Sequence, residues 1–90
     1  MVVTSQQRAY LDALTAAGVK RSSELMALRI GSYVCQARAA KQSDQAVWDV
    51  VVPLVRGDVR TTRLSSAVPS LDEVNSATAD YIRIATDKLC

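Results

Sequence analysis

Apolar residues recur at intervals of three and four along most of the chain, which places them on one face of an α-helix. In the first such segment, TSQQRAYLDALTAAG, Thr4 and Gln7 have the spacing of a capping box, and Gly18 stands where helices commonly end. This pattern predicts a helix over about residues 5–17. Its expected buried face consists of Tyr10, Leu11, Leu14 and Ala17.

A second helix is expected at about 23–40, after a polar turn in which either Ser22 or Ser23 can serve as the N-cap. Its apolar positions at helical spacing are Leu25, Leu28, Cys35 and Ala39. Gly31 falls on the same side and costs about 1 kcal/mol of helix propensity relative to Ala, so we expect it to let another helix approach closely. The pattern also predicts that Cys35 points inward.

The third segment, AVWDVVVPLVRG, is rich in β-branched residues, but no other strand-like segment exists to pair with it. A lone strand would leave its backbone groups unsatisfied, so a helix is favoured. Ser43 can cap this helix, and Asp44 in the first turn suits the helix dipole. We expect the helix at 44–52 or slightly longer, with Pro53 bending or ending it.

The clearest helix is the last, expected at 71–89, with Ser70 at the N-cap and Glu73 three residues later. Its expected buried face consists of Val74, Ala77, Tyr81, Ile84, Ala85 and Leu89. The stretch 57–69 has no consistent period and is rich in Gly, Ser, Thr and Pro, which is typical of a long connection. The chain, residues 1–90, is therefore predicted to be one all-α domain, a small four-helix bundle.

The charge distribution argues against nucleic-acid binding, and the hydropathy argues against a membrane-spanning segment. Eleven basic and nine acidic residues are spread along the chain and give a net charge of +2, without the basic block of a dedicated nucleic-acid-binding protein. No apolar run approaches the roughly 18 residues that span a bilayer. The first residues also lack the pattern of a signal peptide, so we expect an exported form to have lost its signal already.

The candidates for catalysis are weak. The chain contains no histidine, which removes the common Ser–His–Asp and Cys–His arrangements, and its three glycines are isolated rather than grouped in a phosphate loop. The acidic pairs Asp44 with Asp49, and Asp72 with Glu73, each include first-turn residues, for which the helix dipole is a sufficient explanation. We therefore expect no enzyme activity, no cofactor and no metal site.

The two cysteines, Cys35 and Cys90, lack the C-x-x-C spacing or histidine partners of redox and metal sites. A disulfide between them would close a loop of about 56 residues and contribute roughly 4 kcal/mol in the loop-entropy treatment. Such a bond would suit a small domain outside the reducing cytosol. Two free buried thiols are the alternative, and reactive or metal-bound cysteines are less favoured.

The segments GSYVCQARAAKQSDQAVWDVVVPLV and VPSLDEVNSATADYIRIATDKLC resemble small exported proteins of mycobacteria and their actinobacterial relatives, catalogued only as a domain of unknown function. The shared positions are Gly31, Val34, Cys35, Ser43, Val50 to Val52, Pro69, Leu71, Leu89 and Cys90. The resemblance implies a helical, disulfide-bonded, secreted or envelope-associated protein without an assigned activity. A longer connection at 57–69 and the proline at position 53 depart from the family pattern.

Two surfaces are candidates for binding. Arg56, Arg60 and Arg63 form the most basic stretch and suit an anionic partner or a lipid headgroup, although a solvated loop is the simpler explanation. A possible apolar cavity is lined by Trp48, Val51, Leu54 and Tyr81. The leading hypothesis is a monomeric or weakly oligomeric module that binds an unknown protein or envelope component through the third helix and the arginines. The alternative is a carrier of a small apolar ligand, a lipid or haem.

Overall fold

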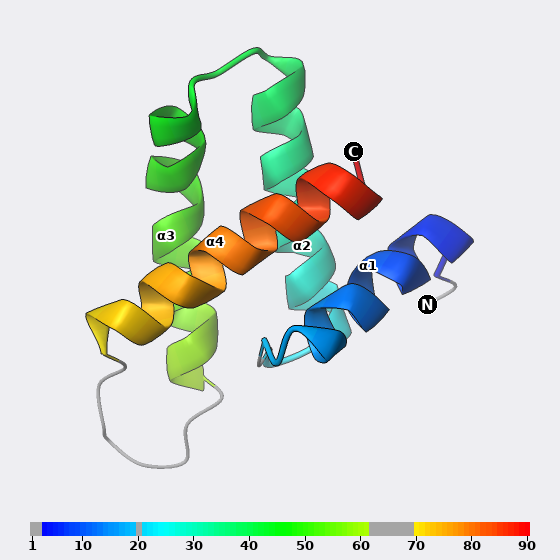
Figure 1. The fold of residues 1–90 in the computed structure, drawn as a ribbon, viewed down its shortest axis with the longest axis horizontal. Coiled ribbons are helices and arrows are strands. Elements are labelled where there is room, and N and C mark those ends of the chain that lie inside the picture. The colour runs from blue at the N-terminus through cyan, green and yellow to red at the C-terminus, as the bar shows by residue number, and fades with distance from the viewer. Residues whose placement is uncertain (1–2, 20, 62–69) are drawn as a thin grey trace.

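The computed structural model describes residues 3–19, 21–61 and 70–90, and within these ranges it contains four α-helices and no strand (Figure 1). The helices are α1 (Ser5–Ala16), α2 (Glu24–Ala39), α3 (Asp44–Thr61) and α4 (Leu71–Lys88). The predicted all-α fold with four helices is confirmed. Every predicted boundary lies within one residue of the observed one except the end of α3.

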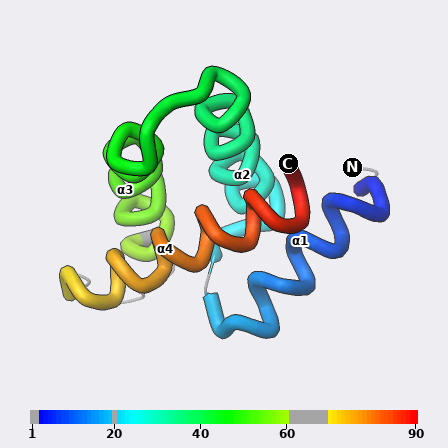
Figure 2. The backbone as a smooth tube through the Cα atoms, turned by 45° about the horizontal axis from the view of Figure 1, so that its top comes forward, coloured from blue at the N-terminus to red at the C-terminus, as the bar shows by residue number. Residues whose placement is uncertain are grey.

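α4 is the helix around which the others are arranged. It crosses one face of the pair formed by α2 and α3, and it contacts all three other helices (Figure 1). α1 packs against α4 and α2, on the side of α2 away from α3 (Figure 2). The buried residues form one core to which all four helices contribute.

The helix starts follow the local signals in the sequence. Thr4 and Gln7 make both hydrogen bonds of a capping box, at 3.1 and 2.9 Å. Ser23, and not Ser22, caps α2, while Ser43 and Ser70 cap α3 and α4. In each of these three caps the serine hydroxyl accepts a hydrogen bond from the backbone N–H three residues later, at 3.1–3.2 Å. Local hydrogen bonding thus determines where each helix begins.

α3 continues through Pro53 to Thr61, well beyond the expected end near residue 52, so of the two alternatives for Pro53 the one in which it ends the helix is wrong. Pro53 is exposed, and its cost of about 3 kcal/mol for a lost hydrogen bond and a steric clash is offset by burial along the rest of the helix. The buried positions of α3 are Val47, Val51, Val55, Asp58 and Val59. Residues 57–61 of the predicted connection at 57–69 are therefore helical, and its remainder, 62–69, lies outside the described residues.

The buried face of α2 also differs from the prediction. Leu25 is 65% exposed, Ala39 is exposed, and Leu28 and Cys35 are half-buried. The residues that face the core are instead Ala27, Ile30, Gly31, Val34 and Ala37. Small residues dominate this face because α2 packs against three helices at once, so close approach matters more there than side-chain size.

The predicted faces of α1 and α4 are largely confirmed. Tyr10, Leu11 and Leu14 have no exposed surface, while Ala17 is exposed as the C-cap of α1. In α4, the buried residues are Val74, Thr78, Tyr81, Ile84 and Ala85, and the predicted Ala77 and Leu89 are half-buried. Thr78 was not expected inside. Its hydroxyl donates to the carbonyl oxygen of Val74 at 2.7 Å, which satisfies the group within the helix.

α1 and α2 end in the same way, on a residue with positive φ. Gly18 has φ +77°, as its position predicted, and Lys41 has φ +58°. In both, the amide of the following residue donates to the carbonyl oxygen five positions back, at 3.0 and 3.1 Å. Lys41 carries the steric cost of this conformation, about 1 kcal/mol, which a glycine avoids.

We expect Lys41→Gly to stabilise the protein, because it removes that steric cost and keeps the hydrogen bonds of the helix end. The gain should be about 0.5–1 kcal/mol, or a rise in Tm of about 3–6 °C, measured by circular dichroism or calorimetry. Lys41→Ala is the matched control, since it removes the same charge but keeps a Cβ. Equal shifts for the two variants would show that backbone conformation at position 41 has no part in the effect.

Candidate functional site

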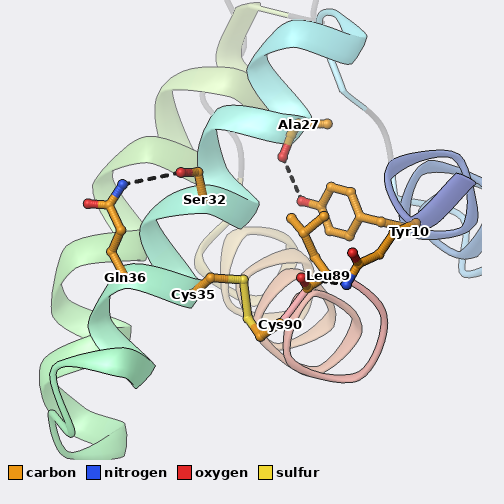
Figure 3. The surroundings of a disulfide bond; sticks show 8 residues. Tyr10, Ala27, Ser32, Cys35, Gln36, Leu89 and Cys90 are labelled. Carbon is orange, nitrogen blue, oxygen red and sulfur yellow. Dashed lines mark hydrogen bonds between the residues drawn. A yellow bond between two sulfur atoms is a disulfide. The ribbon is translucent and has the colours of Figure 1, made fainter. Parts of the chain in front are cut away.

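The disulfide predicted between Cys35 and Cys90 is present, and it joins the middle of α2 to the end of the chain after α4 (Figure 3). The two Cα atoms are 5.3 Å apart, inside the usual range for a cystine. Cys35 is half-buried, and Cys90 is exposed. Both thiols are therefore bonded, and the alternatives with free, reactive or metal-bound cysteines do not apply to this structure.

A groove lies on the surface between α3 and α4, and we call it the Trp48 groove. It is open to solvent, has a volume of about 320 Å³, and is lined by Arg38, Asp44, Trp48, Ala79, Ile82 and Arg83. Trp48 and Ile82 are both half-buried and provide its apolar surface. Arg38 pairs with Asp44 at 2.6 Å, and the exposed Arg83 pairs with Asp80 at 3.3 Å. The groove thus combines apolar surface with two guanidinium groups.

Two of the three predicted arginines lie on the same helix as Trp48. Because α3 continues past Pro53, positions 48, 52, 56 and 60 form a row of adjacent side chains at four-residue spacing. Trp48 and Val52 are half-buried, and Arg56 and Arg60 are exposed. Arg63 lies outside the described residues. The arginines were expected in a loop, whereas Arg56 and Arg60 lie on the same helix as Trp48.

The four residues predicted to line an apolar cavity occupy different environments. Val51 and Tyr81 have no exposed surface, and Leu54 is half-buried. Trp48 lines the open groove. A ligand cavity formed by all four residues together remains a prediction.

Asp58 is a buried carboxylate that the sequence analysis missed. It is 2% exposed and accepts hydrogen bonds from the backbone N–H of Ser22, at 3.2 and 3.3 Å, and from the Ser22 hydroxyl. These bonds attach the last turns of α3 to the link between α1 and α2. The signal was the spacing from Val51 and Val55, which puts Asp58 on the buried face once α3 is extended beyond Pro53.

The chain matches one family over residues 6–90, and that family is described as Protein of unknown function (DUF732). The chain belongs to the DUF732 family. No curated protein and no solved structure matches it. The resemblance to a family without assigned function is therefore confirmed.

Two further findings concern the described part of the DUF732 chain. None of its helices combines the length and the apolar character needed to cross a membrane. Nor do three or more His, Cys, Asp or Glu residues come together there in a way that could hold a metal ion.

Two tyrosines of this DUF732 domain are held inside the core next to charged groups. The Tyr10 hydroxyl donates to the carbonyl oxygen of Ala27 at 2.6 Å. The Tyr81 hydroxyl is buried next to the Asp58 carboxylate, and it makes no hydrogen bond of normal geometry in the described structure. Burial raises the pKa of both tyrosines. The neighbouring Tyr81 raises the pKa of Tyr10 further, and Asp58 does the same for Tyr81. Arg21 acts in the opposite direction on both pKa values. Both side chains therefore stay neutral well into the alkaline range.

We expect the free energy of unfolding to fall as the pH rises above about 10. In the unfolded chain each tyrosine loses its proton near pH 10, whereas the folded chain retains it, so stability is complete below that pH and declines above it. Each tyrosine should contribute a slope of roughly 1.4 kcal/mol per pH unit, measured by urea unfolding. The Tyr10→Phe and Tyr81→Phe variants should each have a shallower slope than the parent. An unchanged slope in either variant would contradict this assignment.

At neutral pH the same two substitutions should differ in cost. Tyr10→Phe removes a buried hydrogen bond to Ala27 and should lower stability by about 1 kcal/mol. Tyr81→Phe removes a desolvated hydroxyl that makes no hydrogen bond of normal geometry with the described residues, so it should cost less than Tyr10→Phe. Urea unfolding of both variants at pH 7 gives the comparison. A larger loss for Tyr81→Phe would mean that this hydroxyl is hydrogen-bonded in solution.

Proposed function

We propose that this protein is a non-enzymatic binding module, secreted or attached to the cell envelope, that recognises a segment of another protein in which acidic and apolar side chains alternate. The observation that carries the proposal is the Trp48 groove, continued along α3 by Arg56 and Arg60.

The chemistry of the groove suits protein recognition. Tryptophan and arginine are the side chains most enriched among residues that dominate binding energy at interfaces. Trp48 and Ile82 offer apolar surface, while the guanidinium of Arg83 can bind a carboxylate with two parallel hydrogen bonds. Its present partner, Asp80, forms an exposed ion pair, which is worth little and can be exchanged for a partner's carboxylate.

The residues that line the groove favour binding over catalysis, and the disulfide favours an extracellular location over the cytosol. The residues that line the groove include ion-paired arginines and one aspartate, but no nucleophile next to a base. The disulfide supports an oxidising compartment, because such bonds are rare in reducing ones. It gives no information about the partner.

A small apolar ligand, such as a lipid or haem, is the second candidate. The volume of about 320 Å³ is at the lower end of the range for small-molecule sites. A small-molecule site usually encloses most of its ligand, whereas this groove is open, so an extended peptide fits the shape better.

Binding can be followed with peptides of defined pattern. A 12-residue peptide that alternates Glu with Leu and Phe is titrated into the protein, and a peptide with Lys in place of each Glu is the charge-reversed control. Trp48 is the only tryptophan of the chain, so its fluorescence reports the groove directly. We expect a change with the acidic peptide, and none with the basic one.

Substitutions then locate the site, with affinity measured by anisotropy of a labelled peptide. Trp48→Ala should weaken binding at least about tenfold, and Arg83→Ala about threefold to tenfold. Arg29→Ala is the matched control, since Arg29 is an exposed arginine on α2 that does not line the groove. Equal effects of Arg29→Ala and Arg83→Ala would contradict the proposed site. A fluorescence change and thermal stabilisation with palmitate or haem, but with neither peptide, would instead support the carrier.

A further inference from the structure

Three residues at four-residue spacing on α2 contact the middle of α1 and the C-terminal end of α4, and two of the three, Ala27 and Cys35, are labelled in Figure 3. The carbonyl oxygen of Ala27 accepts the hydrogen bond from Tyr10 of α1. One turn further, Gly31 faces both Tyr10 and Leu89. After another turn, Cys35 is bonded to Cys90, the neighbour of Leu89. Because these positions share one face of α2, the contacts with Leu89 and Cys90 lie one turn apart.

Gly31 leaves a space that two side chains fill completely. A Cβ atom at this position would lie 2.6 Å from Cδ2 of Leu89 and 2.9 Å from both Cζ and the hydroxyl of Tyr10. These distances are shorter than van der Waals contact, so a larger residue at position 31 would have to displace Leu89 or Tyr10. We call the surface of Gly31 and Tyr10 the Gly31 socket, and Leu89 is the aliphatic side chain that occupies it.

Apart from the disulfide and the packing of its side chain against the core, Leu89 is held by hydrogen bonds at the end of a helix. The amides of Leu89 and Cys90 both donate to the carbonyl oxygen of Ala85, at 2.9 Å. The side-chain amide of Gln6 donates to the carbonyl oxygen of Leu89 at 2.9 Å, and this bond is exposed. Helix ends open locally at little free-energy cost, so the covalent bond of the adjacent Cys90 is the strongest restraint on the position of Leu89.

We propose that the Gly31 socket is a binding site for a leucine-sized side chain, that Leu89 occupies it in the oxidised protein, and that the Cys35–Cys90 disulfide holds Leu89 there as a redox-controlled latch. Reduction releases residues 89–90 and uncovers the socket, while the rest of the bundle stays folded. This inference is independent of the Trp48 groove.

The reaction is ordinary thiol–disulfide exchange with a dithiol protein as the reductant. One of its thiolates attacks the sulfur of Cys90, which is the exposed cysteine of the pair. The S–S bond breaks, a mixed disulfide forms, and Cys35 leaves as a thiolate and takes up a proton. The second thiol of the reductant then displaces Cys90. Two electrons and two protons have passed to the pair, and the reductant is left as a disulfide.

Nitration of the tyrosines tests whether opening is local. Cys35→Ser/Cys90→Ser replaces chemical reduction, because tetranitromethane oxidises free thiols, and the modified residues are identified by peptide mass spectrometry. Tyr10 and Tyr81 are both fully buried, but Tyr10 lies with Leu89 against Gly31, whereas Tyr33 is exposed. We expect nitration of Tyr10 to rise about tenfold or more relative to the oxidised parent, while Tyr81 stays protected.

A second comparison keeps the disulfide intact, so it does not depend on the folding of the cysteine-free variant. Leu89→Ala empties the socket, and it should raise nitration of Tyr10 but not of Tyr81. Leu71→Ala is the matched control, because Leu71 lies at the other end of α4 and is 67% exposed. The latch is refuted if Tyr10 and Tyr81 gain reactivity together, because that indicates global unfolding. It is also refuted if Tyr10 gains no reactivity in either the cysteine-free variant or Leu89→Ala.

Discussion

The bond between Cys35 and Cys90 fixes the end of α4 against the middle of α2, and α4 is the helix that touches the other three. A domain of 90 residues buries a modest share of its surface, so its core alone gives limited stability. The cystine closes most of the chain into a loop and reduces the freedom of the unfolded state. Because α4 crosses both α2 and α3, the cystine joins the C-terminal end of the crossing helix to one of the two helices beneath it (Figure 1).

The start and end of a helix could be predicted where a neighbouring side chain or a glycine determines them. The serine and threonine caps and Gly18 act through hydrogen bonds within a few residues, so the sequence contains all the needed information. The end of α3 could not be predicted in this way. Pro53 is a strong local signal to stop, and only the packing of Val55 and Val59 against distant helices overrides it.

The candidate site was predictable in its parts but not in its arrangement. Trp48, Arg56 and Arg60 were each recognisable from residue type. Their alignment depends on α3 remaining helical past Pro53, which the periodicity alone did not reveal. The face of α2 was misassigned for a related reason: ranking residues by hydrophobicity favours Leu25, whereas close packing of three helices favours Ala27 and Gly31.

Gly31, Cys35, Leu89 and Cys90, which carry much of the family resemblance, form one structural unit. Gly31 makes room for Leu89, and the two cysteines join the neighbouring positions. At the far end of the bundle, Asp58 has a comparable role through charge, because its hydrogen bonds to Ser22 hold the final turns of α3 in place. Those turns carry Arg56 and Arg60. The exposed row proposed to bind a partner therefore depends on a carboxylate buried on the opposite side of the same helix.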